Sequence, residues 1–116
     1  MPIPARWRPL KTLPERRGRD ALPGIYELAD SEKCLIYIGQ SERDVPNRIR
    51  QHLANSPCLQ RRACYWRYAY SRVPQADEAV QLALYRKRHH ALPLCNRAEP
   101  LERGAQRRYR ERSRSS

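Results

Sequence analysis

Residues 24–39 read GIYELADSEKCLIYIG, and this stretch decides the fold. Two apolar runs of β-prone residues, 25–28 and 34–38, flank a polar turn at residues 30–33. Pro23 and Gly24 interrupt any regular element before the first run, and Gly39 ends the second. The pattern predicts an antiparallel hairpin with Tyr26 near its first end and Tyr37 near its last.

A helix is predicted immediately after this hairpin, over residues 47–54. Ser41 is a suitable cap for it, and Pro46 suits its first turn. Ile49 and Leu53 are spaced four residues apart and should face the sheet.

Two more elements are predicted further along the chain. Residues 62–70 alternate aromatic and other side chains, which is typical of a third strand. Residues 75–90 form a second long helix with an apolar stripe that we expect to be core: Ala76, Ala79, Val80, Ala83 and Leu84. The expected fold class is therefore α/β of the α+β kind: a small three-stranded, mainly antiparallel sheet flanked by helices, in the order β-β-α-β-α.

The 116 residues provide for one modest core, with two basic flanks. Residues 1–22 are rich in proline and arginine and are expected to form an extended arm, which either lies on a phosphate backbone or is simply solvated. Residues 23–99 form the folded domain. Residues 100–116 are rich in arginine and serine, with too little apolar content for a core, and are expected to be disordered.

The charge of the chain points to a polyanionic partner. Lys and Arg number 24 against 12 Asp and Glu, which gives a formal charge of +12. Nucleic acid is the first choice of partner, and a basic structural or merely soluble protein is the alternative. A membrane surface is disfavoured because no helix combines a basic face with a large apolar one.

The cysteine pattern and the hydropathy predict a reduced, cytoplasmic protein. Cys34, Cys58, Cys64 and Cys95 form no C-x-x-C pair and fit no common zinc spacing. No apolar run approaches the roughly 20 residues of a membrane span, and the N-terminus lacks the apolar core of a secretory signal. We therefore expect the four cysteines to be free thiols.

Residues 23–97 resemble a GIY-YIG endonuclease domain. The resemblance rests on Gly24-Ile25-Tyr26 and Tyr37-Ile38-Gly39 on successive strands, followed by the expected helix and a late asparagine. It implies a nuclease that acts on DNA with one divalent metal ion, Mg²⁺ or Mn²⁺. The catalytic residues that it implies are Tyr26, Tyr37, Arg48, His52 and Glu78. Nucleic-acid binding is assigned to Gln40, Arg50, Arg67 and Asn96.

The metal ligand has two candidate positions on the second long helix. The spacing common in the family lands on Gln81, a neutral side chain that is a poor ligand for magnesium. Glu78 lies one helical turn earlier on roughly the same side, and we assign the metal to it.

Two rival functions stay open beside the nuclease. One is a nucleic-acid-binding module that keeps the fold but has lost the metal site. The other is a basic RNA-associated structural protein in which the two tripeptides are accidental. A nuclease of this size leaves no room for a separate target-reading domain, so we expect specificity to come from the body, the two arms, a dimer or an additional protein.

Overall fold

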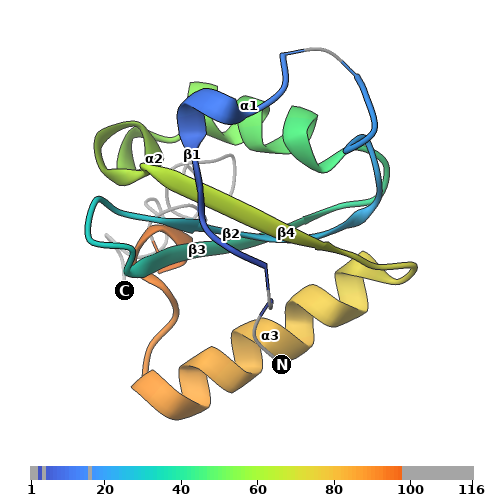
Figure 1. Cartoon of the computed structure of the whole chain (residues 1–116). Helices are drawn as coiled ribbons and strands as arrows, with labels where there is room; N and C mark the ends of the chain where they lie inside the picture. The colour runs from blue at the N-terminus through green and yellow to red at the C-terminus, as the bar shows by residue number, and fades with distance from the viewer. Residues whose placement is uncertain (1–2, 4, 16, 98–116) are drawn as a thin grey trace, which may run out of the picture.

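The computed structural model describes residues 3, 5–15 and 17–97, which fold around a four-stranded antiparallel sheet (Figure 1). The strands are β1 (Arg8–Pro9), β2 (Gly24–Ala29), β3 (Leu35–Ser41) and β4 (Tyr65–Tyr70), in the spatial order β1-β4-β2-β3. The α+β fold and the hairpin are confirmed. The short β1 is one strand more than the three expected.

The hairpin of β2 and β3 places both motif tyrosines on the same face of the sheet. Tyr26 stands opposite Gly39, and Leu28 stands opposite Tyr37. The turn is closed by the Asp30 carboxylate, which accepts hydrogen bonds from two backbone amides beyond it. Because side chains alternate along a strand, Glu27 and Ile38 point to the opposite face.

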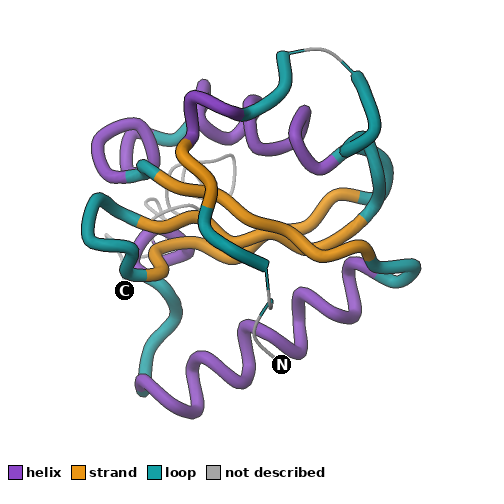
Figure 2. Tube along the Cα trace, in the orientation of Figure 1, coloured by secondary structure: helices purple, strands orange, loops and turns teal. Residues whose placement is uncertain are grey.

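One face of the sheet is covered by α1 (Val45–Asn55) and the short α2 (Pro57–Arg62) (Figures 1 and 2). Val45 and Ile49 of α1 are fully buried against the sheet's core residues, which include Tyr26, Leu28, Tyr37 and Trp66. The core therefore lies between this face and α1.

The caps of these two helices differ from the sequence prediction. Asp44, not Ser41, caps α1, because its carboxylate accepts from the Asn47 amide. Ser41 acts one step earlier and accepts from the Asp44 amide in the preceding loop. No helix is predicted from the sequence over residues 57–62. Ser56 caps this additional helix, α2, with Pro57 in its first turn, a position that proline suits.

The other face of the sheet carries α3 (Pro74–His89), and here the predicted core stripe is wrong. Pro74 is the one buried residue of α3, and the stripe is exposed: Val80 is 52% exposed, and Leu84, which lines a groove between α3 and the sheet, is 47% exposed. The side toward the sheet instead holds half-buried Glu78, Gln81 and Tyr85. Helical periodicity locates an apolar face, but what that face meets depends on the partner surface.

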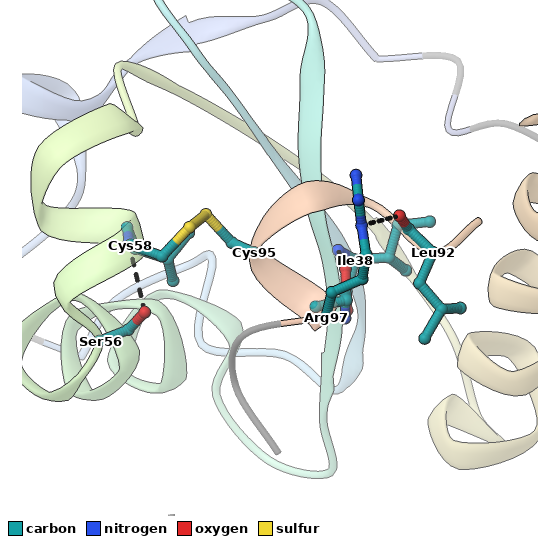
Figure 3. The surroundings of a disulfide bond; sticks show 8 residues. Ile38, Ser56, Cys58, Leu92, Cys95 and Arg97 are labelled. Atoms are coloured by element: carbon teal, nitrogen blue, oxygen red, sulfur yellow. Dashed lines mark hydrogen bonds between the residues drawn. A yellow bond between two sulfur atoms is a disulfide. The ribbon is translucent and has the colours of Figure 1, made fainter. Parts of the chain in front are cut away.

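The expectation of four free thiols is also wrong. Cys58 of α2 and Cys95, just beyond α3, form a disulfide across 37 residues of sequence (Figure 3). Cys34 and Cys64 are free and exposed. Spacing alone cannot reveal a pair that only the fold brings together.

The segment before β2 packs on the body. Leu10 and Leu13 lie against the core, and the Arg67 guanidinium lies 3.9 Å from the centre of the Trp7 ring. The predicted disordered tail at 100–116 lies outside the described residues. Among the residues described, no helix is long and apolar enough to cross a membrane.

Candidate active site

Two buried tyrosine rings from the hairpin form the wall of the site. Tyr26 is fully buried and Tyr37 is 5% exposed, with their ring centres 6.0 Å apart. Gly39 lies directly against both rings. A Cβ added there would lie 2.5 Å from Tyr26 Cζ and 2.8 Å from Tyr37 Cε2, so the rings occupy the space that any side chain at this position needs.

His52 of α1 is hydrogen-bonded to the second motif tyrosine, Tyr37. The Tyr37 hydroxyl and His52 Nδ1 are 2.9 Å apart and share a buried hydrogen bond. The His52 ring also meets the Tyr26 ring edge-on at 6.4 Å. Tyr26, Tyr37 and His52 therefore form one packed cluster between β2, β3 and α1.

The Tyr26 hydroxyl is the cluster's unsatisfied group. Its oxygen is buried and has no hydrogen-bond partner of good geometry among the described residues. Burial raises the pKa of Tyr26 well above 10.0. The neighbouring Tyr37 and Glu78 raise that pKa further, and Arg48 lowers it. The hydroxyl is therefore protonated at neutral pH and is sensitive to charge at the site.

Two charged side chains on different helices, Arg48 and Glu78, influence the pKa of this hydroxyl. Arg48 lies on α1 and donates a long hydrogen bond to the Gln51 side chain at 3.4 Å. Glu78 lies on α3, where burial raises the pKa of its carboxyl group and Arg48 partly offsets the rise. Arg48 and Glu78 each change the pKa of Tyr26, so the fold brings a tyrosine, a guanidinium and a carboxyl group within electrostatic reach.

Gln81, the alternative metal position, lies elsewhere. It lines a groove between α3 and the sheet with Glu27, Ile38 and Tyr85. The two positions that the sequence left open lie on the same side of α3 but differ in their surroundings: Glu78 couples to Arg48, and Gln81 lines the groove. The assignment of the metal to Glu78 stays a prediction.

The four residues assigned to nucleic-acid binding occupy varied surroundings. The buried Gln40 Oε1 has no partner among the described residues, and Gln40 lines a polar hollow of about 290 Å³ that also includes Arg48. Arg50 donates to the Pro14 carbonyl and, at 3.1 Å, to Asn47 Oδ1.

The other two also make internal contacts. Arg67 donates to Glu27 at 2.7 Å. Asn96 bonds both the amide and the carbonyl of Ile38, at 2.8 and 2.9 Å. Arg50, Arg67 and Asn96 therefore hold the fold together, and their contact with nucleic acid stays a prediction.

Sequence reasoning missed two residues of this region. Gln51 is the hydrogen-bond partner of Arg48, and the i, i+3 spacing on a helix was the available signal. Glu27 is 2% exposed and stands opposite Arg67 on β4. The sequence signal for Glu27 was a single acidic residue within an otherwise apolar strand. A carboxylate that is buried at such a position needs a cationic partner.

The oxygen ligands available at the site fit a hard cation that takes few of its ligands from the protein. No group of three or more His, Cys, Asp or Glu side chains that could hold a metal occurs in residues 3, 5–15 and 17–97. Magnesium, however, keeps several waters and is commonly held through one or two carboxylates. Glu78, which is within electrostatic reach of the Tyr26 hydroxyl, supplies one such carboxylate.

Comparison with known proteins gives one match. The family model of the GIY-YIG catalytic domain matches residues 22–90, which is more than half of the chain. No curated protein and no solved structure matches the chain.

Proposed function

The chain belongs to the GIY-YIG family, whose catalytic domain is a nuclease, and on this basis we propose that it is a metal-dependent endonuclease that hydrolyses DNA. One observation carries the proposal: β2, α1 and α3 bring Tyr26, Arg48 and Glu78 within electrostatic reach of one another. Phosphodiester hydrolysis needs these three kinds of group, since it requires a positioned nucleophile, positive charge on the phosphate and help for the leaving oxygen.

Arg48 binds the scissile phosphate in this proposal. A guanidinium can donate to two phosphate oxygens at once, and it stabilises negative charge that grows in the transition state. Its hydrogen bond to Gln51, at 3.4 Å, is weak enough to be exchanged for a phosphate oxygen. The polar hollow beside it, lined by Gln40 and Asn47, receives the backbone of the substrate.

Tyr26 orients the attacking water. Its buried hydroxyl makes no hydrogen bond of good geometry among the described residues, although Tyr37 interacts with it, so it can still bond to a water that enters the cluster. Because burial raises its pKa, Tyr26 can act as a base only when positive charge close by stabilises the phenolate. Arg48 supplies part of that charge, and the hydrogen-bonded pair of Tyr37 and His52 keeps the ring wall in place.

Glu78 is the residue that would hold Mg²⁺ or Mn²⁺. The ion, when bound, supplies Lewis-acid stabilisation of the leaving oxygen. Glu78 serves this purpose as a carboxylate, and Arg48 favours that form against the effect of burial.

Nicking of supercoiled plasmid with Mg²⁺ or Mn²⁺ tests the proposal. We expect Arg48→Ala and Glu78→Ala each to slow nicking by about 100-fold or more. The exposed Arg61→Ala and Glu32→Ala are matched controls and should nick like the wild type.

Absence of metal-dependent cleavage by the wild type, on supercoiled, linear and branched DNA alike, would overturn the proposal. Retained DNA binding without cleavage would instead favour the nucleic-acid-binding module. Full activity of Glu78→Ala would show that the metal assignment is wrong. A cytoplasmic location, and a dimer or additional protein that supplies target specificity, remain parts of the proposal.

A further inference from the structure

A groove of about 650 Å³ runs between the inner side of α3 and the sheet face opposite the core. It exists because α3 buries no side chain after Pro74, so the helix does not fill the space above the sheet. Leu35 and Ile38 form part of the sheet wall, and Leu84 and Tyr85 form part of the helix wall. The volume is within the range of small-ligand sites, roughly 300–1,000 Å³.

The groove combines apolar walls with a cationic end. Lys87 and Arg88 line it near the end of α3, and neither forms an ion pair among the described residues. The acid on the sheet wall, Glu27, is paired with Arg67 at 2.7 Å and does not offset those two charges. An occupant with a flat apolar part and a negative charge therefore complements the groove.

The aromatic group in the groove, Tyr85, is half-buried. Tyr85 is braced by His89 one turn later, with ring centres 4.1 Å apart. A braced aromatic ring in a groove that also has apolar walls suits a nucleobase, because every base has a face that stacks on an aromatic ring.

The groove continues the proposed active site along α3. Gln81 lines it and lies three residues after Glu78 on the same side of the helix. At 1.5 Å per residue, the groove begins about 5 Å along the helix axis from Glu78, and Arg88 lies about 15 Å along it. A strand that passes Glu78 can thus follow the inner side of α3.

We infer that this groove binds an unpaired nucleotide of the strand that enters the active site, with its base against Tyr85 and its phosphate at Lys87 and Arg88. The inference rests on the proposed nuclease function, which it extends to a preference for substrates with single-stranded ends, flaps or gaps. An uncharged apolar peptide would leave the two cations unused, which is why a nucleotide fits better.

Binding without a metal tests the inference separately from catalysis. A dye-labelled single-stranded oligothymidine and a blunt duplex of equal length are titrated with the full chain in EDTA. Tyr85→Ala should weaken oligothymidine binding by about 5- to 100-fold, whereas Tyr85→Phe should keep it. Tyr70→Ala, at a tyrosine that is 58% exposed and does not line the groove, is the control and should bind like the wild type.

A pair of charge variants avoids dependence on Tyr85 packing. Leu84 is 47% exposed, so both Leu84→Glu and Leu84→Lys should fold. Leu84→Glu should weaken oligothymidine binding by at least about 10-fold relative to Leu84→Lys, because only glutamate repels a phosphate.

Equal oligothymidine affinity of Tyr85→Ala and wild type would overturn the inference, as would equal affinity of the two Leu84 variants. So would a Tyr85→Ala loss that is equally large for blunt duplex. If the protein is an active nuclease and shows any of these results, only the nucleotide assignment of the groove is refuted. Groove binding in a protein that never cleaves DNA would refute the nuclease proposal and leave the groove assignment standing.

Discussion

Gly39→Ala is the change that tests the tyrosine wall most directly. The added Cβ would lie 2.5 Å from Tyr26 Cζ, 2.6 Å from the Tyr26 hydroxyl oxygen and 2.8 Å from Tyr37 Cε2. Favourable contacts between carbon atoms lie near 3.5–4.0 Å, so at least one ring must move by about 1 Å. Neither ring moves freely, because Tyr26 is fully buried and Tyr37 is bonded to His52.

The expected loss is larger in activity than in stability. Overpacking of a buried site costs about 1–3 kcal/mol, which lowers the Tm of a domain of this size by about 5–20 °C. A displacement of about 1 Å in a catalytic group can reduce the rate by about 100-fold. Plasmid nicking should therefore nearly vanish at temperatures where Gly39→Ala is still folded.

Circular dichroism melts and nicking at a temperature below both transitions measure the two losses separately. Gly18→Ala is the matched control, since Gly18 is exposed and has no positive φ, and it should leave both readouts unchanged. A Gly39→Ala protein with the wild-type Tm and nicking rate would refute the tight contact between this glycine and the two rings.

Two further predictions concern α3 and the disulfide. Burial raises the pKa of Glu78, so the stability that this carboxyl group contributes is fully present below its ordinary pKa of 4.5 and is lost as pH rises through the folded-state pKa. Glu78→Gln should therefore melt at a higher temperature than wild type at pH 7, by a margin that fades near pH 4, while nicking is lost; an equal or lower Tm at pH 7 would contradict this. Replacing Cys58 and Cys95 by serine opens a link across 37 residues and should lower the free energy of unfolding in urea by about 3–4 kcal/mol. Cys34→Ser should not lower it, and an unchanged urea midpoint in the double variant would contradict the prediction.

The hairpin was predictable because its signals are local. The apolar runs, the polar turn and the flanking Pro23 and Gly39 all lie within one short stretch, and the pairing of β2 with β3 follows from the turn. Two tyrosines on one face follow as well. Once Tyr26 stands opposite Gly39, strand alternation places Leu28 and its partner Tyr37 beside it.

Contacts between distant segments were not predictable from the same signals. The disulfide joins Cys58 to Cys95, and Asn96 bonds to Ile38 across 58 residues of sequence. Neither contact produces a periodic pattern in the sequence. The surroundings of Glu78 and Gln81 depend likewise on how α3 packs against the sheet, which its own sequence does not fix, and the choice of metal ligand between them stays a prediction.

The orientation of α3 has a physical cause in β2. Alternation along this strand sends Tyr26 to the face under α1 and Glu27 to the face under α3. The Glu27–Arg67 pair therefore occupies the middle of the second face. An apolar helix stripe packed on a charged pair would remove the remaining water from both ions without offering hydrogen bonds, which is unfavourable.

A polar helix side is the better neighbour for that face. Turning α3 so that Glu78, Gln81 and Tyr85 face inward leaves the ion pair partly hydrated and keeps the groove open. The same rotation leaves Glu78 half-buried and within electrostatic reach of Arg48 and Tyr26. A single buried acid next to the first motif tyrosine thus accounts for three features: the exposed apolar stripe, the groove, and the carboxylate at the proposed active site.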